Sequence, residues 1–224
     1  MTELSNADLS NAVWTERADL YRTSAVHVAG PDLDLIVEWA AGSATVLDVA
    51  TGGGHVARRL REAGLQVVTA DPAPGMQPDV ICPAEHLPFA AASFDVVACR
   101  RAAHHFQDVA GAVAEMARVS KALVLLQDAV RVDDRVERAE WLRDPSHVRH
   151  HTEEEWRGFF AAAGLEVEAA EHFVEHLDFE SWLARTGCEG ETAREVRELL
   201  APETDGDGWN YPYVVFKTRK RAGA

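Results

Sequence analysis

Three consecutive glycines, residues 52 to 54, constrain the fold of this chain more than any other feature. They follow a short β-forming run, Thr45 to Ala50, and they precede an amphipathic segment, His55 to Ala63, that Gly64 ends. Glycine lets the backbone turn sharply and approach a ligand closely, because it has no Cβ atom. A strand, a glycine-rich loop and a helix in this order are typical of an open α/β sheet, whose ligands bind at the carboxyl ends of the strands.

The rest of the chain continues this alternation of strands and helices. Apolar runs predict strands at 65–70, 79–82, 94–99, 122–127, 165–170 and 211–217. Helical patterns lie at 6–28, 31–39, 108–119, 153–164 and 178–200. The core strands are uniformly apolar, as expected where helices cover both faces of a sheet. The alternation therefore predicts a doubly wound α/β fold with a mostly parallel sheet.

Length, charge and cysteine usage narrow the class of protein. A chain of 224 residues allows one large domain and hardly two. Its formal net charge of -15 argues against unaided binding of nucleic acid, whose phosphates need a basic face. There is no apolar run long enough to span a bilayer, and the N-terminal segment lacks the pattern of a signal peptide. Three scattered cysteines predict no disulfide framework, so we expect a cytoplasmic protein without a membrane or nucleic-acid partner.

Two cofactor classes use a loop of this kind. The stretch from Gly52 to Ala57 fits the dinucleotide fingerprint G-x-G-x-x-A, which keeps an NAD-dependent enzyme as an alternative. Asp71 ends the second predicted strand, where a carboxylate can accept both hydroxyls of an adenosine ribose. Asp48 favours S-adenosylmethionine, because a carboxylate inside the first strand would repel a pyrophosphate but suits an ammonium and a sulfonium group.

Several motifs together resemble the class I S-adenosylmethionine-dependent methyltransferases of the type 11 group, typified by ubiquinone and menaquinone biosynthesis. These are VLDVATGGG at 46–54, AEHLPF at 84–89 and SFDVV at 93–97. More narrowly, the chain resembles a bacterial subgroup of uncharacterised methyltransferases. The motifs shared with that subgroup are Tyr21-x-x-Ser24-x-x-His27, Arg100-x-Ala-Ala-His-His-Phe106, Arg143-Asp-Pro-Ser-His147 and the helical pair Glu155-Trp156.

The resemblance implies a Rossmann-like fold with a seven-stranded sheet, whose last strand is antiparallel, and S-adenosylmethionine as cofactor, with S-adenosylhomocysteine as product. Carried over motif by motif, it assigns cofactor contacts along the chain. The methionine part would lie beside Asp48, Ala50, Thr51, Gly52, Gly53 and Gly54, the ribose at Asp71, the adenine at Ala84 and Glu85, and the methionine or substrate side at Arg100. The single domain, 1–224, would comprise lid helices (1–40), a cofactor-binding core (41–130) and a lid segment with the C-terminal sheet portion (131–224).

The chain departs from the family pattern after Asp71. Members usually have a whole helix there, but here three prolines within 72–78 forbid a long one. Pro83 also stands where many members have an aspartate before the Ala-Glu pair. We therefore expect a cofactor pocket that is open on one side or is closed by the second subunit of a homodimer. The shortened pocket also motivates an alternative function, a non-transferring protein that catalyses a cyclisation or rearrangement or senses the cofactor.

The expected function is transfer of a methyl group to an O, C or N atom of a small-molecule acceptor. His104 or His105 could accept a proton from the acceptor, because the imidazole pKa lies near neutrality. The lid would contribute substrate contacts from Tyr21, His27, Arg143 and His147. Adjacent histidines on a strand end usually point in different directions, so His104 and His105 are not expected to share an ion. His147, His150 and His151 lie close together with Asp144, and His172/His176 have the spacing of a helix face but sit in a predicted strand or turn. A metal site needs convergent ligands that neighbouring groups support. No metal site is therefore expected.

Overall fold

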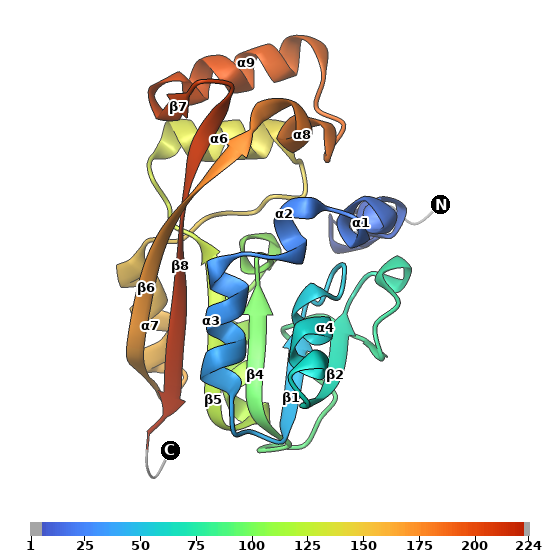
Figure 1. Cartoon of the computed structure of the whole chain (residues 1–224), viewed down its shortest axis with the longest axis vertical. Coiled ribbons are helices and arrows are strands. Elements are labelled where there is room, and N and C mark those ends of the chain that lie inside the picture. Colours follow the sequence, from blue (N-terminus) through green and yellow to red (C-terminus); the bar gives the residue numbers. More distant parts are fainter. Residues whose placement is uncertain (1–5, 222–224) are drawn as a thin grey trace.

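A central sheet organises the molecule, with the strand order β3-β2-β1-β4-β5-β8-β6 and with β7 paired to β8 (Figure 1). The computed structural model describes residues 6–221; residues 1–5 and 222–224 of the predicted domain lie outside the described residues. The strands are β1 (Thr45–Val49), β2 (Gln66–Asp71), β3 (Val80–Ile81), β4 (Phe94–Arg100), β5 (Ser120–Ala129), β6 (Leu165–Asp178), β7 (Thr204–Asp205) and β8 (Gly208–Lys220).

The directions of the strands confirm the predicted fold class. The pairs β1–β2, β1–β4, β2–β3 and β4–β5 are parallel, whereas β8 is antiparallel to both of its long neighbours, β5 and β6. All seven predicted strands are present. An eighth, the two-residue β7, forms a hairpin with β8 within the Gly- and Asp-rich stretch 203–209, where the sequence pattern favours a surface loop.

Helices cover both faces of the sheet and the carboxyl ends of its strands (Figure 1). α3 (Pro31–Ala40) and α4 (His55–Glu62) contact each other over one face, and α5 (Val109–Val119) contacts α7 (Glu153–Ala162) over the other. α7 begins with a capping box, in which Thr152 and Glu155 bond to each other's backbone N–H groups. α1 (Asn6–Arg22) and the short α2 (Ala25–Val28) lie near the carboxyl ends of the parallel strands.

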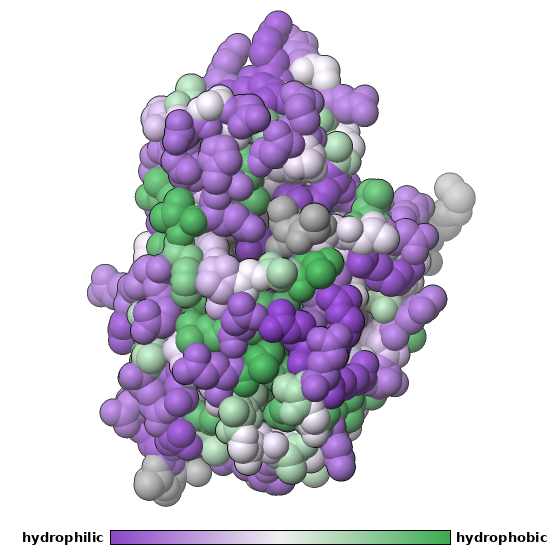
Figure 2. Space-filling view, viewed as in Figure 1, coloured by the Kyte–Doolittle hydropathy of each residue, from purple (hydrophilic) through white to green (hydrophobic). Residues whose placement is uncertain are grey.

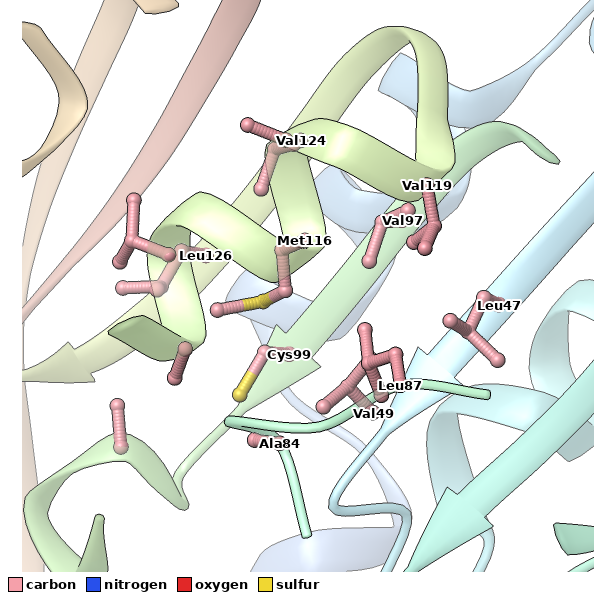
Figure 3. Close-up of a cluster of buried hydrophobic side chains, with 14 of the residues drawn as sticks. Leu47, Val49, Ala84, Leu87, Val97, Cys99, Met116, Val119, Val124 and Leu126 are labelled. Atoms are coloured by element: carbon pink, nitrogen blue, oxygen red, sulfur yellow. The ribbon is translucent and has the colours of Figure 1, made fainter. Parts of the chain in front are cut away.

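Two apolar layers hold the helices on the sheet. On the side of α5 and α7, Leu47, Val97 and Cys99 of the strands pack with Met116, and all four side chains are fully buried (Figure 3). On the other side, Leu33 and Ile36 of α3 pack with residues of α4 and of the central strands. Burial of each large aliphatic side chain contributes about 1.5–3 kcal/mol, so both layers fix the strand ends that carry the site.

A third cluster forms a cap beyond the ends of β6 and β8. The cap consists of α6 (Asp134–Arg143), α8 (Phe179–Ala184), α9 (Gly190–Leu200) and the adjoining ends of the two strands (Figure 1). Its own core contains Trp182, Val196, Leu200 and Trp209, each at most 2% exposed. β6 and β8 are longer than predicted. Past residue 170, exposed and covered side chains alternate along β6, and the apolar run from which the strand was predicted ends there.

The helix that family members usually have after the second strand is absent here, as the three prolines predict. After β2 the chain makes only the short 3-10 turn η1 (Pro74–Met76) before β3. The face in Figure 2 is mainly hydrophilic, with hydrophobic residues in small groups. Within residues 6–221, none of the helices combines the length and the apolar character that crossing a bilayer requires.

Candidate functional site

A pocket opens at the carboxyl ends of β1, β2 and β4, between α1 and the cap. Most residues that the sequence assigns to cofactor or substrate line it. They are Asp48, Ala50, Thr51, Gly52, Gly53, Asp71, Ala84, Glu85, Arg100, His104, His105, Tyr21, His27 and Arg143. Gly54 and His147 are the two predicted site residues that do not line the pocket.

The glycine loop owes its shape to backbone conformations that few residues adopt. Ala50, Gly52 and Gly54 have φ values of 53°, 51° and 74°, in the left-handed region. At Gly53 the reason for glycine is space, since a Cβ atom would lie 2.8 Å from the carbonyl oxygen of Tyr21 and 2.8 Å from His55 Nε2. The loop therefore meets the end of α1 directly, and His55 Nε2 bonds to the Tyr21 oxygen at 2.8 Å.

Asp48 lies beneath this loop and is 1% exposed. Its Oδ2 accepts hydrogen bonds from Thr51 Oγ1 at 2.5 Å and from the backbone N–H of Ala57 at 3.2 Å. Burial, with a smaller contribution from the charge of Asp71, raises the pKa of Asp48 to about 7 against the two hydrogen bonds. A cation bound nearby would favour the ionised carboxylate.

Asp71 is the second carboxylate at the loop, and it is 6% exposed. Its Oδ2 accepts from the N–H of Gly52 at 3.0 Å, and its Oδ1 accepts from the N–H of Ala73 at 2.9 Å. Burial raises the pKa of Asp71 despite these two bonds. Each oxygen keeps a further lone pair, so the carboxylate fits two ribose hydroxyls. Two carboxylates at one glycine loop suit a sulfonium cofactor with a ribose and oppose a pyrophosphate.

The predicted adenine side is formed by the segment after β3. Ala84 is 4% exposed, and it lines the pocket together with Pro83 and Glu85. The carboxylate of Glu85 accepts from the N–H groups of Gln107 at 3.2 Å and Asp108 at 3.3 Å. Glu85 therefore ties this segment to the loop before α5, and Pro83 and Ala84 give the segment an apolar surface at the pocket.

α1 covers the side of the pocket that the absence of a helix after β2 would otherwise leave open. Gly75 in η1 contacts Thr15, where a Cβ atom would come within 2.5 Å of the Thr15 carbonyl oxygen. Arg22 Nη1 donates to the Gly75 oxygen at 2.8 Å. Trp14 and Tyr21 pack edge to face at 5.0 Å and present aromatic surface to the pocket. The chain thus closes this side with its own N-terminal helix.

Arg100, predicted to face the cofactor, directs its guanidinium toward α2 and α3, which together with α1 form the lead-in helices. Its Nε and Nη2 donate to the two carboxylate oxygens of Asp32 at 2.6 and 3.1 Å, and its Nη1 donates to the carbonyl of His27 at 3.0 Å. Burial works against ionisation of Asp32, but the hydrogen bonds and charge of Arg100 lower its pKa. The side chain of Arg100 is thereby committed to holding α2 and α3 against β4.

The two predicted bases sit in η2 (Ala103–His105), directly after β4. His104 Nδ1 bonds to Asp128 Oδ1 at 2.6 Å, so this carboxylate engages Nδ1 rather than Nε2. Burial lowers the pKa of His104, but the Asp128 carboxylate outweighs it and raises the pKa overall. His105 Nδ1 donates to the carbonyl of Ser146 at 3.0 Å, and burial and the charge of His104 lower its pKa to about 3. The ring of His105 is therefore neutral, with Nε2 as the acceptor atom.

Of the lid residues, Tyr21, His27 and Arg143 reach the pocket and His147 lies behind it. Arg143 stacks 4.2 Å from the ring of Trp182 and donates to Glu140 Oε2 at 3.3 Å. His147 is 5% exposed and contacts Glu137 Oε2 at 3.3 Å. The structure brings His104, His147 and His150 together, a grouping that the sequence analysis did not make.

Three charged residues of the site escaped the sequence analysis. Asp128 orients His104, Glu137 joins His147 to His150, and Arg185 enters the pocket from the end of α8. Asp128 ends an apolar strand next to the strand that precedes the histidine pair, and this position is a signal that could have found it. Glu137 and Arg185 carry no such signal, because only the folding of the cap brings them to the site.

Comparison with known proteins agrees with this geometry. A family profile described as a methyltransferase domain matches residues 21–170. The uncharacterised methyltransferase YcgJ of Bacillus subtilis (strain 168) is 31% identical over 216 residues, which cover 86% of the chain and 85% of YcgJ.

Solved structures extend the likeness to the fold. The crystal structure of YcgJ matches with a TM-score of 0.76 and 29% identity over 86% of this chain and 99% of that one. A protein of Bacillus halodurans C-125, provisionally assigned to the methyltransferases, matches with a TM-score of 0.75 and 30% identity over 86% of this chain and 100% of that one. The chain therefore belongs to the methyltransferase domain family, and it is an enzyme that uses S-adenosylmethionine.

Proposed function

We propose that the chain transfers a methyl group from S-adenosylmethionine to an O, C or N atom of a small-molecule acceptor, with S-adenosylhomocysteine as product. The observation that carries the proposal is one continuous pocket that joins the glycine loop and Asp71 to His105 and the lid. Methyl transfer requires mainly that the acceptor atom lie in line with the sulfonium methyl in a site without water. The cover of α1 and the cap over this pocket suits that requirement. We further propose a cytoplasmic, biosynthetic role, in keeping with three buried free cysteines.

We propose that His105 accepts a hydrogen bond from the methyl acceptor. Its neutral ring offers Nε2 as a hydrogen-bond acceptor, and its Nδ1 is held by the carbonyl of Ser146. A hydroxyl or amine of the acceptor that donates to Nε2 would have its lone pair turned away from the ring. His105 would thus orient the attacking atom.

The cationic wall of the pocket indicates the class of acceptor. Arg185 lines the pocket, and no carboxylate whose side chain the structure describes forms a salt bridge with it. Burial and the positive charge of Arg143 lower the pKa of Arg185 to about 10, so it keeps its charge at neutral pH. Arg143, by contrast, is paired with Glu140. We propose that the acceptor carries an acidic group, a carboxylate or a phosphate, that pairs with Arg185.

The experiment is an acceptor screen that measures formation of S-adenosylhomocysteine. Phenolic and enolic acceptors are compared in matched pairs, with and without an acidic group. The proposal expects turnover, a preference for the acidic member, and loss of that preference through a higher KM in Arg185→Gln. Arg194→Gln is the control, because Arg194 is exposed on α9. Weaker binding of S-adenosylhomocysteine in Arg185→Gln would assign the guanidinium to the cofactor carboxylate instead.

Titration calorimetry separates the alternatives. Binding of S-adenosylmethionine without formation of S-adenosylhomocysteine from any acceptor would favour a non-transferring protein that catalyses a cyclisation or senses the cofactor. Binding of NAD in place of S-adenosylmethionine would contradict the proposal at the cofactor. Sedimentation measurements on the same sample test for the homodimer, which α1 makes unnecessary for closing the pocket.

A further inference from the structure

Three histidines from two distant segments meet behind the wall of the pocket. His104 comes from η2, and His147 and His150 come from the segment between α6 and α7. One nitrogen from each ring can be chosen so that all three lie within 4.8 Å of one another. The ring centroids of His147 and His150 are 4.6 Å apart, and that of His104 is 5.6 and 5.2 Å from them. The convergence that the sequence did not reveal is therefore present.

Each ring is held by a carboxylate through one nitrogen, and the only long contact to a second nitrogen among the described residues is that of the Tyr211 hydroxyl with His150 Nε2 at 3.5 Å. Asp128 Oδ1 holds Nδ1 of His104 at 2.6 Å. Glu137 contacts His147 Nε2 at 3.3 Å and His150 Nδ1 at 3.0 Å with its two oxygens. Carboxylates that fix the far nitrogen of a histidine are the usual support of metal-ligating imidazoles, because they set the tautomer and raise the basicity of the ligand.

The surroundings of the cluster are buried and negative. His147 and His150 are 5% and 3% exposed, and Asp128 is 1% exposed. Glu140, 3% exposed, lies close enough for its charge to act on both His104 and His147, and its Oε1 has no hydrogen-bond partner among the described residues. The carboxylates of Asp128, Glu137 and Glu140 place negative charge around the three rings. Such a charge balance favours a cation and disfavours an anionic ligand.

We propose that His104, His147 and His150 bind one divalent transition-metal ion of the zinc class. Imidazole nitrogens suit Zn²⁺, Co²⁺ and Ni²⁺, whereas Mg²⁺ and Ca²⁺ prefer oxygen ligands. Nitrogens at about 2.0–2.1 Å from a tetrahedral Zn²⁺ lie about 3.3 Å from one another, so the rings rotate inward when the ion binds. Three histidines and one open position form the ligand set of a catalytic zinc site.

The open position of the ion would lie toward the pocket, because His104 lines the pocket while the other two ligands lie behind it. This placement rests on the proposed function: a hydroxyl oxygen of the methyl acceptor would complete the coordination. An oxygen bound to the ion loses its proton more readily, since the positive charge stabilises the oxyanion. The released proton would pass to water at the mouth of the pocket, and His105 would orient the acceptor through the ring that the Ser146 carbonyl holds.

The test measures metal binding by the full-length protein without any acceptor. Chelator-treated protein is dialysed against Zn²⁺, and bound metal is counted by mass spectrometry; Co²⁺ is added separately to read the visible absorption of a tetrahedral site. We expect one ion per chain and at least a tenfold loss of affinity in His147→Gln and in His150→Gln. Asp128→Asn should weaken binding by about 10–100-fold, as for other supports of ligating histidines. His172→Gln is the matched control, because its ring is exposed and pairs with Glu153 outside the cluster.

Two readouts keep the outcome unambiguous. The variants should bind S-adenosylhomocysteine with unchanged affinity, which would show that they lose the metal without losing the fold. This affinity is measured separately from methyl transfer, so failure of the metal proposal is distinguishable from failure of the proposed function. For the unaltered protein, Zn²⁺ but not Mg²⁺ should raise the Tm. Absence of both the Tm rise and the tetrahedral cobalt spectrum, or zinc binding in both cluster variants equal to that of His172→Gln, overturns the proposal.

Discussion

Arg100 at the end of β4 and Asp32 at the start of α3 form a bidentate ion pair that is closed to solvent. The two hydrogen bonds measure 2.6 and 3.1 Å, and the side chains are 3% and 0% exposed. The same guanidinium holds the carbonyl of His27. The pair therefore ties the lead-in helices, which cover the pocket, to the strand that ends in the histidine pair.

Asp32→Asn should destabilise the protein strongly, because it leaves the charge of Arg100 buried without a partner. Removing one member of a buried pair costs about 3–5 kcal/mol. Urea unfolding measures the change, with Glu195→Gln as control in the exposed pair of Glu195 with Arg138. The control should change the unfolding free energy by less than about 0.5 kcal/mol. Equal effects of the two substitutions would mean that the Arg100 pair does not anchor the lead-in.

Asp48 should make cofactor affinity depend on pH. In the free protein its pKa is raised to about 7, chiefly by burial, so the group is largely protonated below that pH. The cationic cofactor favours the ionised form, and binding therefore releases a proton at acidic pH. Calorimetry should show affinity for S-adenosylmethionine rising by up to about tenfold per unit as pH approaches 7, then levelling.

Asp48→Asn is the matched variant for that titration, since the amide keeps the shape of the side chain and one acceptor oxygen. It should flatten the rise near pH 7. The stability of the free protein should depend on pH in the opposite direction. Because the pKa of Asp48 is raised by folding, ionisation of Asp48 lowers the free energy of unfolding as pH rises from about 4 to about 7. Asp48→Asn should therefore be more stable than the unaltered protein at pH 8. A pH profile that persists in Asp48→Asn would assign it to another group, with Asp71 the first to examine.

Asp71→Asn should weaken binding of S-adenosylhomocysteine by about 1–3 kcal/mol, through loss of charge-assisted hydrogen bonds to the ribose. The amide can still accept from the N–H of either Gly52 or Ala73, which limits damage to the loop. Calorimetry with S-adenosylhomocysteine and then with adenine alone locates the loss. Unchanged binding would show that the ribose lies elsewhere, and equal losses for both ligands would point to a displaced loop.

The sequence predicted the cofactor half of the site well and the acceptor half poorly, for a physical reason. Asp48, Gly52 and Asp71 lie on or beside two adjacent strands, so local patterns and strand order suffice to bring them together. His104 contacts His150 only because the chain folds back through α6 over the ends of the sheet, and no local sequence pattern predicts that contact. Arg100 illustrates the converse: its position was predicted, but its partner, Asp32, is 68 residues away and lies in a helix whose packing no local pattern fixes.

The contact between Gly75 and Thr15 gives the last prediction, which concerns the cover over the pocket. Gly75→Ala places a Cβ atom 2.5 Å from the Thr15 carbonyl oxygen and 2.7 Å from its Cα, so α1 must move away from η1. Overpacking of this kind costs about 1–3 kcal/mol. Trypsin should then cut more rapidly at Arg17 and Arg22 in α1, and S-adenosylhomocysteine should bind more weakly. Gly158→Ala in α7 is the control, since a Cβ atom there meets nothing within 4 Å. If Gly75→Ala is digested and binds like the control, α1 is not what closes this side of the pocket, and a second subunit becomes the candidate to test.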